Sequence, residues 1–221
     1  MHEQLLAIAE PVLDKVRDHP FWSGLRDGSL PPESLGRFVI QDTGFLLPTY
    51  ARSLARCAAN ASDDGHAYLL AQSVVGTLEA RDRLRSAYQQ LASEHGWPLV
   101  PATPEIDPGT HAHTSFFLAA SAKSVAAGVA ALLPMVLFNQ GVADDLLTRQ
   151  TPGGRYAPWI TVYHPGETFD FVRKAFLGLV DEIAERASAD ERAEIVEQFT
   201  LSIRYEWAFA ENALRAPSWP V

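Results

Sequence analysis

The sequence predicts an all-α fold, a single-domain helical bundle that spans residues 1–221. Apolar residues recur every three or four positions along most of the chain, which is the spacing of a buried helix face. No run of alternating apolar and polar residues indicates a strand, and β-branched residues never cluster as they do in strands. With 221 residues and a hydrophobic fraction of 47%, the chain can fill one sizeable core, and no linker or repeat divides it.

The first half of the chain contains predicted helices that are separated by proline and glycine. Residues 3–18 form the first helix, which ends at His19-Pro20 because the residue before a proline disfavours the α region. A short segment, 21–27, follows. Pro31-Pro32 then opens a long helix that reaches about residue 60, since proline is tolerated in a first turn. A further helix restarts at residues 61–63 and stops at His95-Gly96.

The second half begins with a predicted loop. Residues 96–112 hold four prolines and two glycines, and Thr114 is the expected N-cap of a helical stretch that reaches about residue 147, with a break near Gly128. Residues 155–165 are expected to form a second, ordered loop. Helices at 166–187 and 189–215 complete the chain, and Ser188 with Glu191 forms a capping box for the last one.

Composition and charge exclude several classes of protein. The net charge of −9, with no cluster of Lys and Arg, argues against binding to nucleic acid. No uninterrupted apolar run reaches the roughly 18 residues of a membrane-spanning helix, and the start of the chain lacks the pattern of a signal peptide. The single cysteine, Cys57, cannot form an intrachain disulfide. We expect a cytoplasmic protein with no membrane partner and a pocket for a small aromatic or heteroaromatic ligand.

Polar residues interrupt the apolar stripes of three predicted helices. Asp42 falls four residues after Phe38, Glu206 three residues after Ile203, and Asn139 four residues after Met135. Because an unpaired carboxylate is costly to bury, Asp42 and Glu206 must accept hydrogen bonds, form an ion pair, or take part in ligand binding or catalysis. The pattern predicts a polar cavity inside the bundle, to which Tyr156, Trp159 and Tyr163 add aromatic rings. In the structural alternative Asp42 holds a loop amide or an arginine, Glu206 pairs with Arg204 or Lys174, and Met135 fills the core.

Short motifs along the whole chain resemble those of one known family. They are His19-Pro20-Phe21-Trp22, Leu25-x-Asp27-Gly28-Ser29-Leu30-Pro31, Phe38-x-x-Gln41-Asp42, Ala130-Ala131-Leu132-Leu133-Pro134, Tyr156-x-x-Trp159-Ile160-x-x-Tyr163 and Tyr205-Glu206-Trp207-x-Phe209. In this order they resemble the motifs of TenA-type proteins, the thiaminase II family. The resemblance implies a heme-oxygenase-like bundle that is commonly a homotetramer, needs no metal or organic cofactor, and hydrolyses thiamin or an aminopyrimidine derived from it.

The resemblance also assigns residue roles. Asp42 would bind the aminopyrimidine, Glu206 would act as the acid and base, and Tyr163 would lie near the reacting centre. Phe209 would stack on the substrate.

Four positions depart from the family pattern. The family nucleophile is a cysteine, and Met135 stands in its place, with a thioether that has no proton to lose. Three pocket tyrosines of the family correspond to Phe45, His113 and Asn139. We therefore expect these four residues to line a substrate pocket that differs from that of an ordinary thiaminase II.

Three hypotheses about function follow. The first is a diverged enzyme that hydrolyses a heteroaromatic C–N bond, or catalyses a cofactor-free cyclisation or oxidation. The second is a small-molecule-binding or regulatory protein that has lost catalysis. The third is a metal-dependent oxygenase with His66, His111 and His113 as ligands, although no helix carries the Glu-x-x-His pattern of a helical di-iron site, so no metal is expected.

Overall fold

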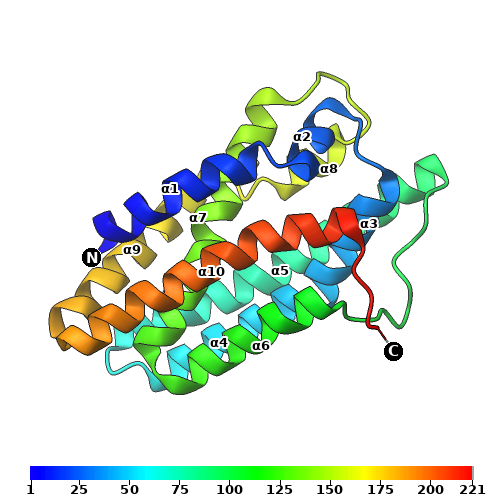
Figure 1. The fold of residues 1–221 in the computed structure, drawn as a ribbon. Helices are drawn as coiled ribbons and strands as arrows, with labels where there is room; N and C mark the ends of the chain where they lie inside the picture. Colours follow the sequence, from blue (N-terminus) through cyan, green and yellow to red (C-terminus); the bar gives the residue numbers. More distant parts are fainter. Residues whose placement is uncertain (221) are drawn as a thin grey trace.

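The computed structural model describes residues 1–220, and within them every regular element is helical (Figure 1). This confirms the predicted all-α class. The elements are α1 (His2–Arg17), α2 (Pro20–Asp27), α3 (Pro32–Gln41), η1 (Asp42–Leu46), α4 (Leu47–Asn60), α5 (Asp64–His95), α6 (Pro108–Lys123), α7 (Val125–Arg149), α8 (Ala157–Tyr163), α9 (Phe169–Arg186) and α10 (Ala189–Arg215).

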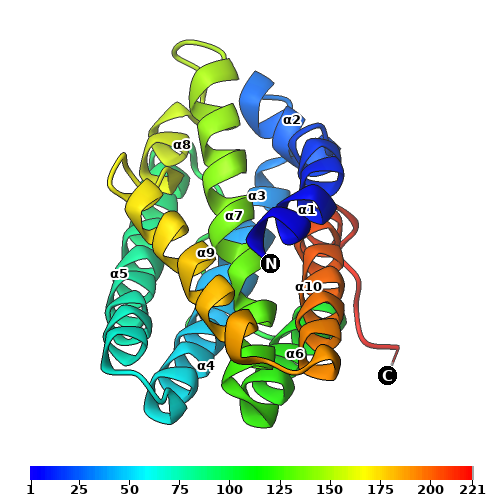
Figure 2. The ribbon, with the colours of Figure 1, turned by 90° about the vertical axis from the view of Figure 1, so that its left-hand side faces the viewer.

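Helix α7 runs through the middle of the bundle. The pair α4 and α5 lies on one side of it, α1 and α10 lie on the other, and α9 crosses its face (Figure 2). By length and composition α7 could cross a membrane, but 67% of its most apolar window is buried in the bundle, as in the core helix of a soluble protein. The apolar character of α7 is thus explained by packing.

Three helix starts follow the sequence signals. The carboxylate of Asp63 accepts from the backbone N–H of His66 at 3.1 Å. Ser188 and Glu191 form the predicted capping box before α10. His19 caps α2, because its Nδ1 accepts from the backbone N–H of Phe21 at 3.1 Å while its Nε2 contacts Glu211 at 3.0 Å. Local capping chemistry fixes these boundaries.

The expected start of α6 is wrong. Asp107 is the N-cap, accepting from the backbone N–H of Thr110 at 2.6 Å, and Pro108 occupies the first turn. Thr114 lies inside the helix, where its hydroxyl donates to the carbonyl of Thr110. A proline after an aspartate suits the start of a helix as well as a loop, so the proline count misled the prediction.

Two further boundaries differ from expectation. The break between α6 and α7 is at Ser124, whose Oγ accepts from the backbone N–H of Ala127, and not at Gly128. Gly128 is needed for packing, because a Cβ there would overlap the Sγ of Cys57. The expected ordered loop at 155–165 contains the short helix α8 instead, with Pro158 in its first turn.

The long helix expected from Pro31 to residue 60 contains a π-helical segment, η1. The backbone N–H of Leu47 donates to the carbonyl of Asp42, five residues earlier. Pro48 explains this geometry, since it has no N–H and in a regular helix its ring would clash with the carbonyl of Gly44. The segment adds one residue to the helical turn that begins at Asp42.

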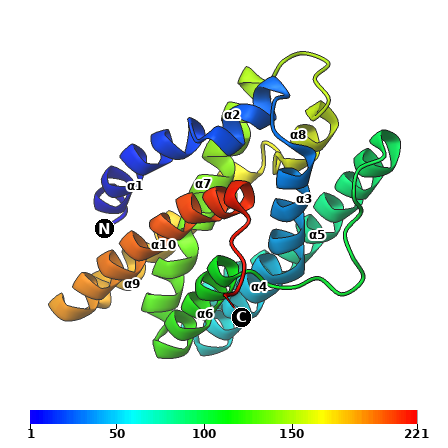
Figure 3. The ribbon, with the colours of Figure 1, turned by 45° about the vertical axis from the view of Figure 1, so that its right-hand side comes forward.

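The end of the loop 96–107 is bonded to the last residue of α3, and the C-terminal tail descends from α10 to this part of the loop (Figure 3). The amide of Gln41 donates to the carbonyl of Glu105 at 2.8 Å and accepts from the backbone N–H of Asp107 at 3.1 Å. The indole of Trp219 donates to the carbonyl of Ile106 at 3.0 Å. The residue before Asp42 is therefore held by the loop.

Candidate active site

A cavity of about 440 Å³ lies inside the bundle, within the size range of small-molecule sites. Its walls come from all the helices except α6, from η1, and from the segment between α8 and α9. Six of the eight site residues predicted from the sequence line it: Asp42, Met135, Asn139, Tyr163, Glu206 and Phe209. These residues are far apart in the sequence, and the fold brings them to one cavity.

Asp42 is buried at the first position of η1. Burial raises the pKa of its carboxyl to about 7. Within residues 1–220 no Lys, Arg or His lies within ion-pair distance of this carboxyl. The structural alternative, in which Asp42 holds an arginine, therefore finds no support.

Glu206 reaches the same cavity from α10. Burial, with the nearby charge of Asp42, raises the pKa of its carboxyl to about 8. Its Oε1 is enclosed and has no hydrogen-bond partner in the described chain. Lys174, the suggested structural partner, pairs with Asp170 at 2.6 Å instead. The two carboxyl groups line one cavity with no cation paired to them in the described residues, and burial favours the protonated form of both.

Two phenols and one amide complete the polar part of the cavity. Tyr163 is the last residue of α8, and burial followed by the charge of Asp42 raises the pKa of its phenol. Burial, with the charge of Glu206, likewise raises the pKa of Tyr50, whose hydroxyl donates to the carbonyl of Leu132 at 3.2 Å. Both phenols stay protonated near neutral pH, and Asn139 adds an amide beside them.

An aromatic wall adjoins these polar groups. The ring of Phe38 lies 5.2 Å from that of Phe209, 5.3 Å from that of Trp22 and 6.3 Å from that of Tyr163. Trp159 stacks on Tyr163 with ring centroids 5.0 Å apart. The ring faces of such a wall suit a flat aromatic ligand.

No thiol of residues 1–220 lines the cavity. Met135 occupies the wall on α7, where the resemblance predicts a nucleophile. Cys57 is fully buried on α4 outside the lining, and burial raises the pKa of its thiol to about 11. A thiolate nucleophile is therefore absent from the described part of the site.

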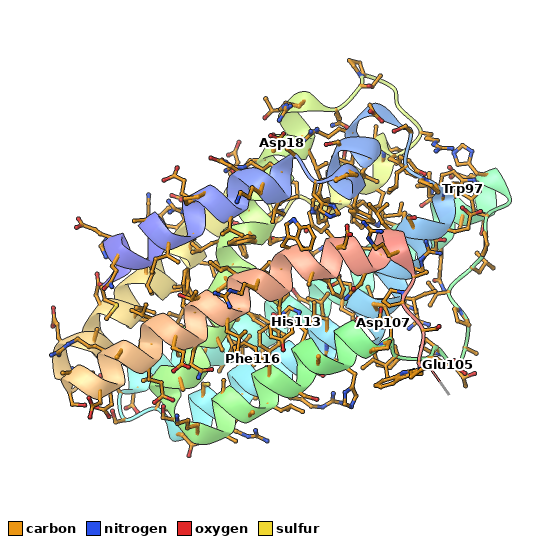
Figure 4. The ribbon with its side chains drawn as sticks, viewed as in Figure 1. Asp18, Trp97, Glu105, Asp107, His113 and Phe116 are labelled. Carbon is orange, nitrogen blue, oxygen red and sulfur yellow. The ribbon has the colours of Figure 1, made fainter. Side chains whose placement is uncertain are left out.

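Two predicted pocket residues, His113 and Phe45, do not line the cavity. His113 lies between α6 and α10 (Figure 4), stacked on Tyr205 with ring centroids 4.8 Å apart. Both of its ring nitrogens are enclosed without a partner in the described chain, and burial lowers its pKa to about 3. Phe45 is turned away because η1 holds an extra residue, so Leu46, four residues after Asp42, takes the expected position in the wall.

The histidines proposed as metal ligands are not brought together. His66 pairs with Glu182 at 2.8 Å, His111 lies edge-on to Trp219, and His113 is in the core. Among residues 1–220 no group of three or more His, Cys, Asp or Glu side chains is placed to hold a metal ion. The geometry gives the oxygenase hypothesis no support.

The sequence reasoning missed one wall of the cavity. Helix α5 contributes polar and small side chains, including Ser73, Thr77 and Ala80. Their polarity made them resemble an exposed helix face. The available signal was the regular spacing of these small and hydroxyl-bearing residues within a helix of 32 residues.

Comparisons with known proteins match one family along nearly the whole chain. The family model described as the TENA/THI-4/PQQC family matches residues 6–216. The aminopyrimidine aminohydrolase of Bacillus subtilis (strain 168) is 29% identical over 209 residues, covering 91% of this chain and 84% of the relative. The aminopyrimidine aminohydrolase of Halalkalibacterium halodurans is 27% identical over 219 residues, covering 96% and 94%.

Solved structures show the same fold. The TenA homologue from P. horikoshii OT3 has a TM-score of 0.77 at 24% identity, covering 96% of this chain and 97% of that one. A TenA homologue from Pyrococcus furiosus has a TM-score of 0.80 at 19% identity, covering 96% and 100%.

Proposed function

The chain belongs to the TENA/THI-4/PQQC family, and from this premise we propose that it hydrolyses the exocyclic C–N bond of a small heteroaromatic amine. The fold is the all-α, heme-oxygenase-like bundle that the resemblance implied. Relatives named aminopyrimidine aminohydrolase make an aminopyrimidine the first substrate to test. The observation that carries the proposal is the pair Asp42 and Glu206, enclosed in one cavity with no cation paired to either carboxyl within residues 1–220.

The carboxyl pair supplies an acid and a base. In the proposed mechanism Asp42 is the ionised partner, which orients the amino group of the substrate. Glu206 keeps its proton near pH 7 and donates it to the heteroaromatic amine. The aromatic wall around Phe38 and Phe209 holds the ring in place.

Water acts as the nucleophile in place of the missing thiol. Its oxygen adds to the ring carbon that bears the amino group, and a carboxylate of the pair accepts the proton that the water loses. The C–N bond then breaks, its electron pair leaves with the nitrogen, and the protonated nitrogen departs as ammonia. The ring keeps the new C–O bond, so one water is consumed for each ammonia released.

The changes at Met135 and Asn139 favour a substrate other than the ordinary aminopyrimidine of the family. Met135 and Asn139 line the cavity where the family pattern has a cysteine and a tyrosine. A thioether and an amide change both the shape and the hydrogen bonding of that wall. We therefore include other heteroaromatic amines among the candidate substrates.

Ammonia release tests the proposal. Wild-type protein is incubated with aminopyrimidines, thiamin and a panel of heteroaromatic amines, and ammonia and products are measured. Replacing Glu206 by Gln removes the acid, so we expect turnover to fall about 100-fold or more. Glu185→Gln, on the exposed face of α9, is the matched control and should keep wild-type turnover. Equal turnover by Glu206→Gln would remove this residue from the mechanism.

Met135 also favours a second candidate, a binding protein without catalysis, because no thiol of the described chain faces the ligand space. Calorimetry with the same compounds separates the two. Tight binding of a heteroaromatic amine with no product from any compound supports the binding protein, whereas turnover excludes it.

Assembly into a homo-oligomer stays a prediction, which analytical ultracentrifugation tests.

A further inference from the structure

Helix α5 borders the cavity for about four turns. Its lining residues run from Leu69 to Leu84, which at 1.5 Å per residue corresponds to about 22 Å. They form two rows. The inner row is buried or half-buried and consists of Leu69, Ser73, Thr77, Ala80 and Leu84, and the exposed outer row consists of Gln72, Gly76, Glu79 and Arg83.

The facing side of this opening comes from the segment before α9 and from its first turn. Pro165, Thr168 and Phe169 line the cavity here, and Thr168 is exposed. Figure 2 shows α5 and the start of α9 on the same side of the bundle. The cavity thus opens as a slit along α5, and a single aromatic ring at Asp42 and Glu206 leaves this slit empty.

Gly76 marks the middle of the slit. Within the described chain no heavy atom lies within 4 Å of the position that a Cβ would take, so no neighbouring helix requires the glycine. The missing side chain leaves room on the outer row of α5 for a ligand to lie close to the backbone.

The charged lining residues differ in exposure. Asp42 is buried and Glu206 is half-buried, whereas Arg83 is exposed on the outer row of α5 and is the one Lys or Arg among the described lining residues. Within residues 1–220 Arg83 forms no ion pair, although Glu79 lies one turn before it. An anionic group would be repelled by the ionised carboxyl and attracted by Arg83.

We propose that the substrate has two parts, a heteroaromatic amine and an arm that ends in a carboxylate or phosphate. The ring lies at Asp42 and Glu206, and this placement rests on the proposed function. The arm lies in the slit along the outer row of α5, beside Gly76, and its anionic end pairs with Arg83. The difference in charge between the exposed Arg83 and the two carboxyls fixes the orientation of the substrate.

Binding of unreactive analogues tests the arm separately from catalysis. Two analogues share one aminopyrimidine ring and an arm of equal length, which ends in a carboxylate in one and a carboxamide in the other. We expect calorimetry to show about fivefold tighter binding of the carboxylate by wild-type protein, the size of an exposed ion pair. Arg83→Gln should abolish this ratio, and Glu79→Gln should increase it. Arg85→Gln, on the same helix but outside the lining, should leave it unchanged.

A second variant tests whether the arm lies in the slit beside Gly76. Gly76→Leu fills the slit without a clash at Cβ, so both armed analogues should bind about tenfold more weakly while the ring alone binds as before. Gly178→Leu is the matched control, since Gly178 is also helical with no described atom within 4 Å of its Cβ position and does not line the cavity. Thermal unfolding verifies that each variant is folded.

The outcomes separate this inference from the proposed function. Equal binding of the two armed analogues by wild-type protein, or a carboxylate preference that survives Arg83→Gln, overturns the acidic arm. Unchanged binding of armed analogues by Gly76→Leu overturns the slit as its location. If the preference is found but no heteroaromatic amine yields ammonia, the arm subsite stands and the hydrolase proposal fails.

Discussion

The carboxyl pair and His113 are both buried and titratable, yet they lie in different surroundings. Asp42 and Glu206 border a cavity of about 440 Å³, whereas His113 is packed between Tyr205 and Phe117 and does not line that cavity. Burial raises the pKa values of the two carboxyls and lowers that of His113, so each group is driven toward its neutral form. Of the two, the carboxyl pair has room for a substrate, and open space therefore distinguishes a reactive group from a core residue.

The same contrast applies to the departures from the family pattern. Met135 and Asn139 alter the wall of the cavity, and they bear on substrate choice. His113 is buried in the core and Phe45 is half-buried, and neither residue lines the cavity. Four substitutions that look equivalent in the sequence thus fall into two kinds.

The largest effect should appear in the pH dependence of hydrolysis. With pKa values of about 7 for Asp42 and about 8 for Glu206, the singly protonated pair is most populated between these values. We expect kcat/KM to peak there and to fall about tenfold per pH unit on either side. In Glu206→Gln the alkaline limb should disappear together with most of the activity. A flat profile from acid to alkaline pH would contradict the shared-proton mechanism.

The next effect concerns stability and should distinguish His113 from the carboxyl pair. The folded-state pKa of His113, about 3, lies below its unfolded value of 6.5. The contribution of neutral His113 to the free energy of unfolding is therefore complete above pH 6.5, and it is lost as the pH falls toward 3. His113→Phe keeps a ring and removes two unpaired nitrogens, so it should raise the free energy of unfolding by about 2 kcal/mol at about pH 5. Denaturation in urea measures this, and kcat should stay within about twofold of wild type.

The carboxyl pair should give the opposite slope. Its folded-state pKa values lie above the unfolded ones, so its contribution is complete below about pH 4 and is lost as the pH rises through 7 and 8. Urea denaturation of His113→Phe from acid to alkaline pH isolates this slope. If the free energy of unfolding of His113→Phe still decreases as the pH is lowered from about 6, a group other than His113 causes the loss of stability in acid.

A smaller change should follow from restoring the thiol. Met135→Cys places a thiol in the wall of the cavity that Glu206 also lines, and an ionised Glu206 can accept a proton from a thiol within its reach. We expect ammonia release from aminopyrimidines to rise about tenfold, together with inactivation by iodoacetamide. Ala58→Cys on α4 controls for a thiol outside the cavity. If Met135→Cys is alkylated by iodoacetamide but releases ammonia at the wild-type rate, the nucleophile does not limit the reaction.

The smallest effect is expected at Phe45. Phe45→Tyr restores the residue type of the family pattern, but the side chain lies outside the lining. We expect KM and kcat to change less than about twofold, as measured with the best substrate found. A larger loss or gain would show that the π-helical segment rearranges when substrate binds.

The sequence allowed the fold class to be predicted because it follows from local periodicity, and the same signal pointed to three polar residues of the cavity. Asp42, Asn139 and Glu206 stood out as polar residues on apolar helix faces, and all three line the cavity. The start of α6 was wrong because Asp107-Pro108 suits a loop and a helix start equally well. The placement of His113 behind the wall depends on packing between α6 and α10, which no local pattern reports.

The π-helical segment has a consequence for changes in chain length. One residue added at η1 lets Leu46, instead of Phe45, face the cavity, while the helix continues into α4. Deleting Gly44 would remove the extra residue and would place Leu46 three residues after Asp42, the spacing of the pocket residue in the family pattern. An insertion or deletion here changes which side chains reach the substrate without replacing any of them, so homologues with different pockets can arise by indels as well as by substitution.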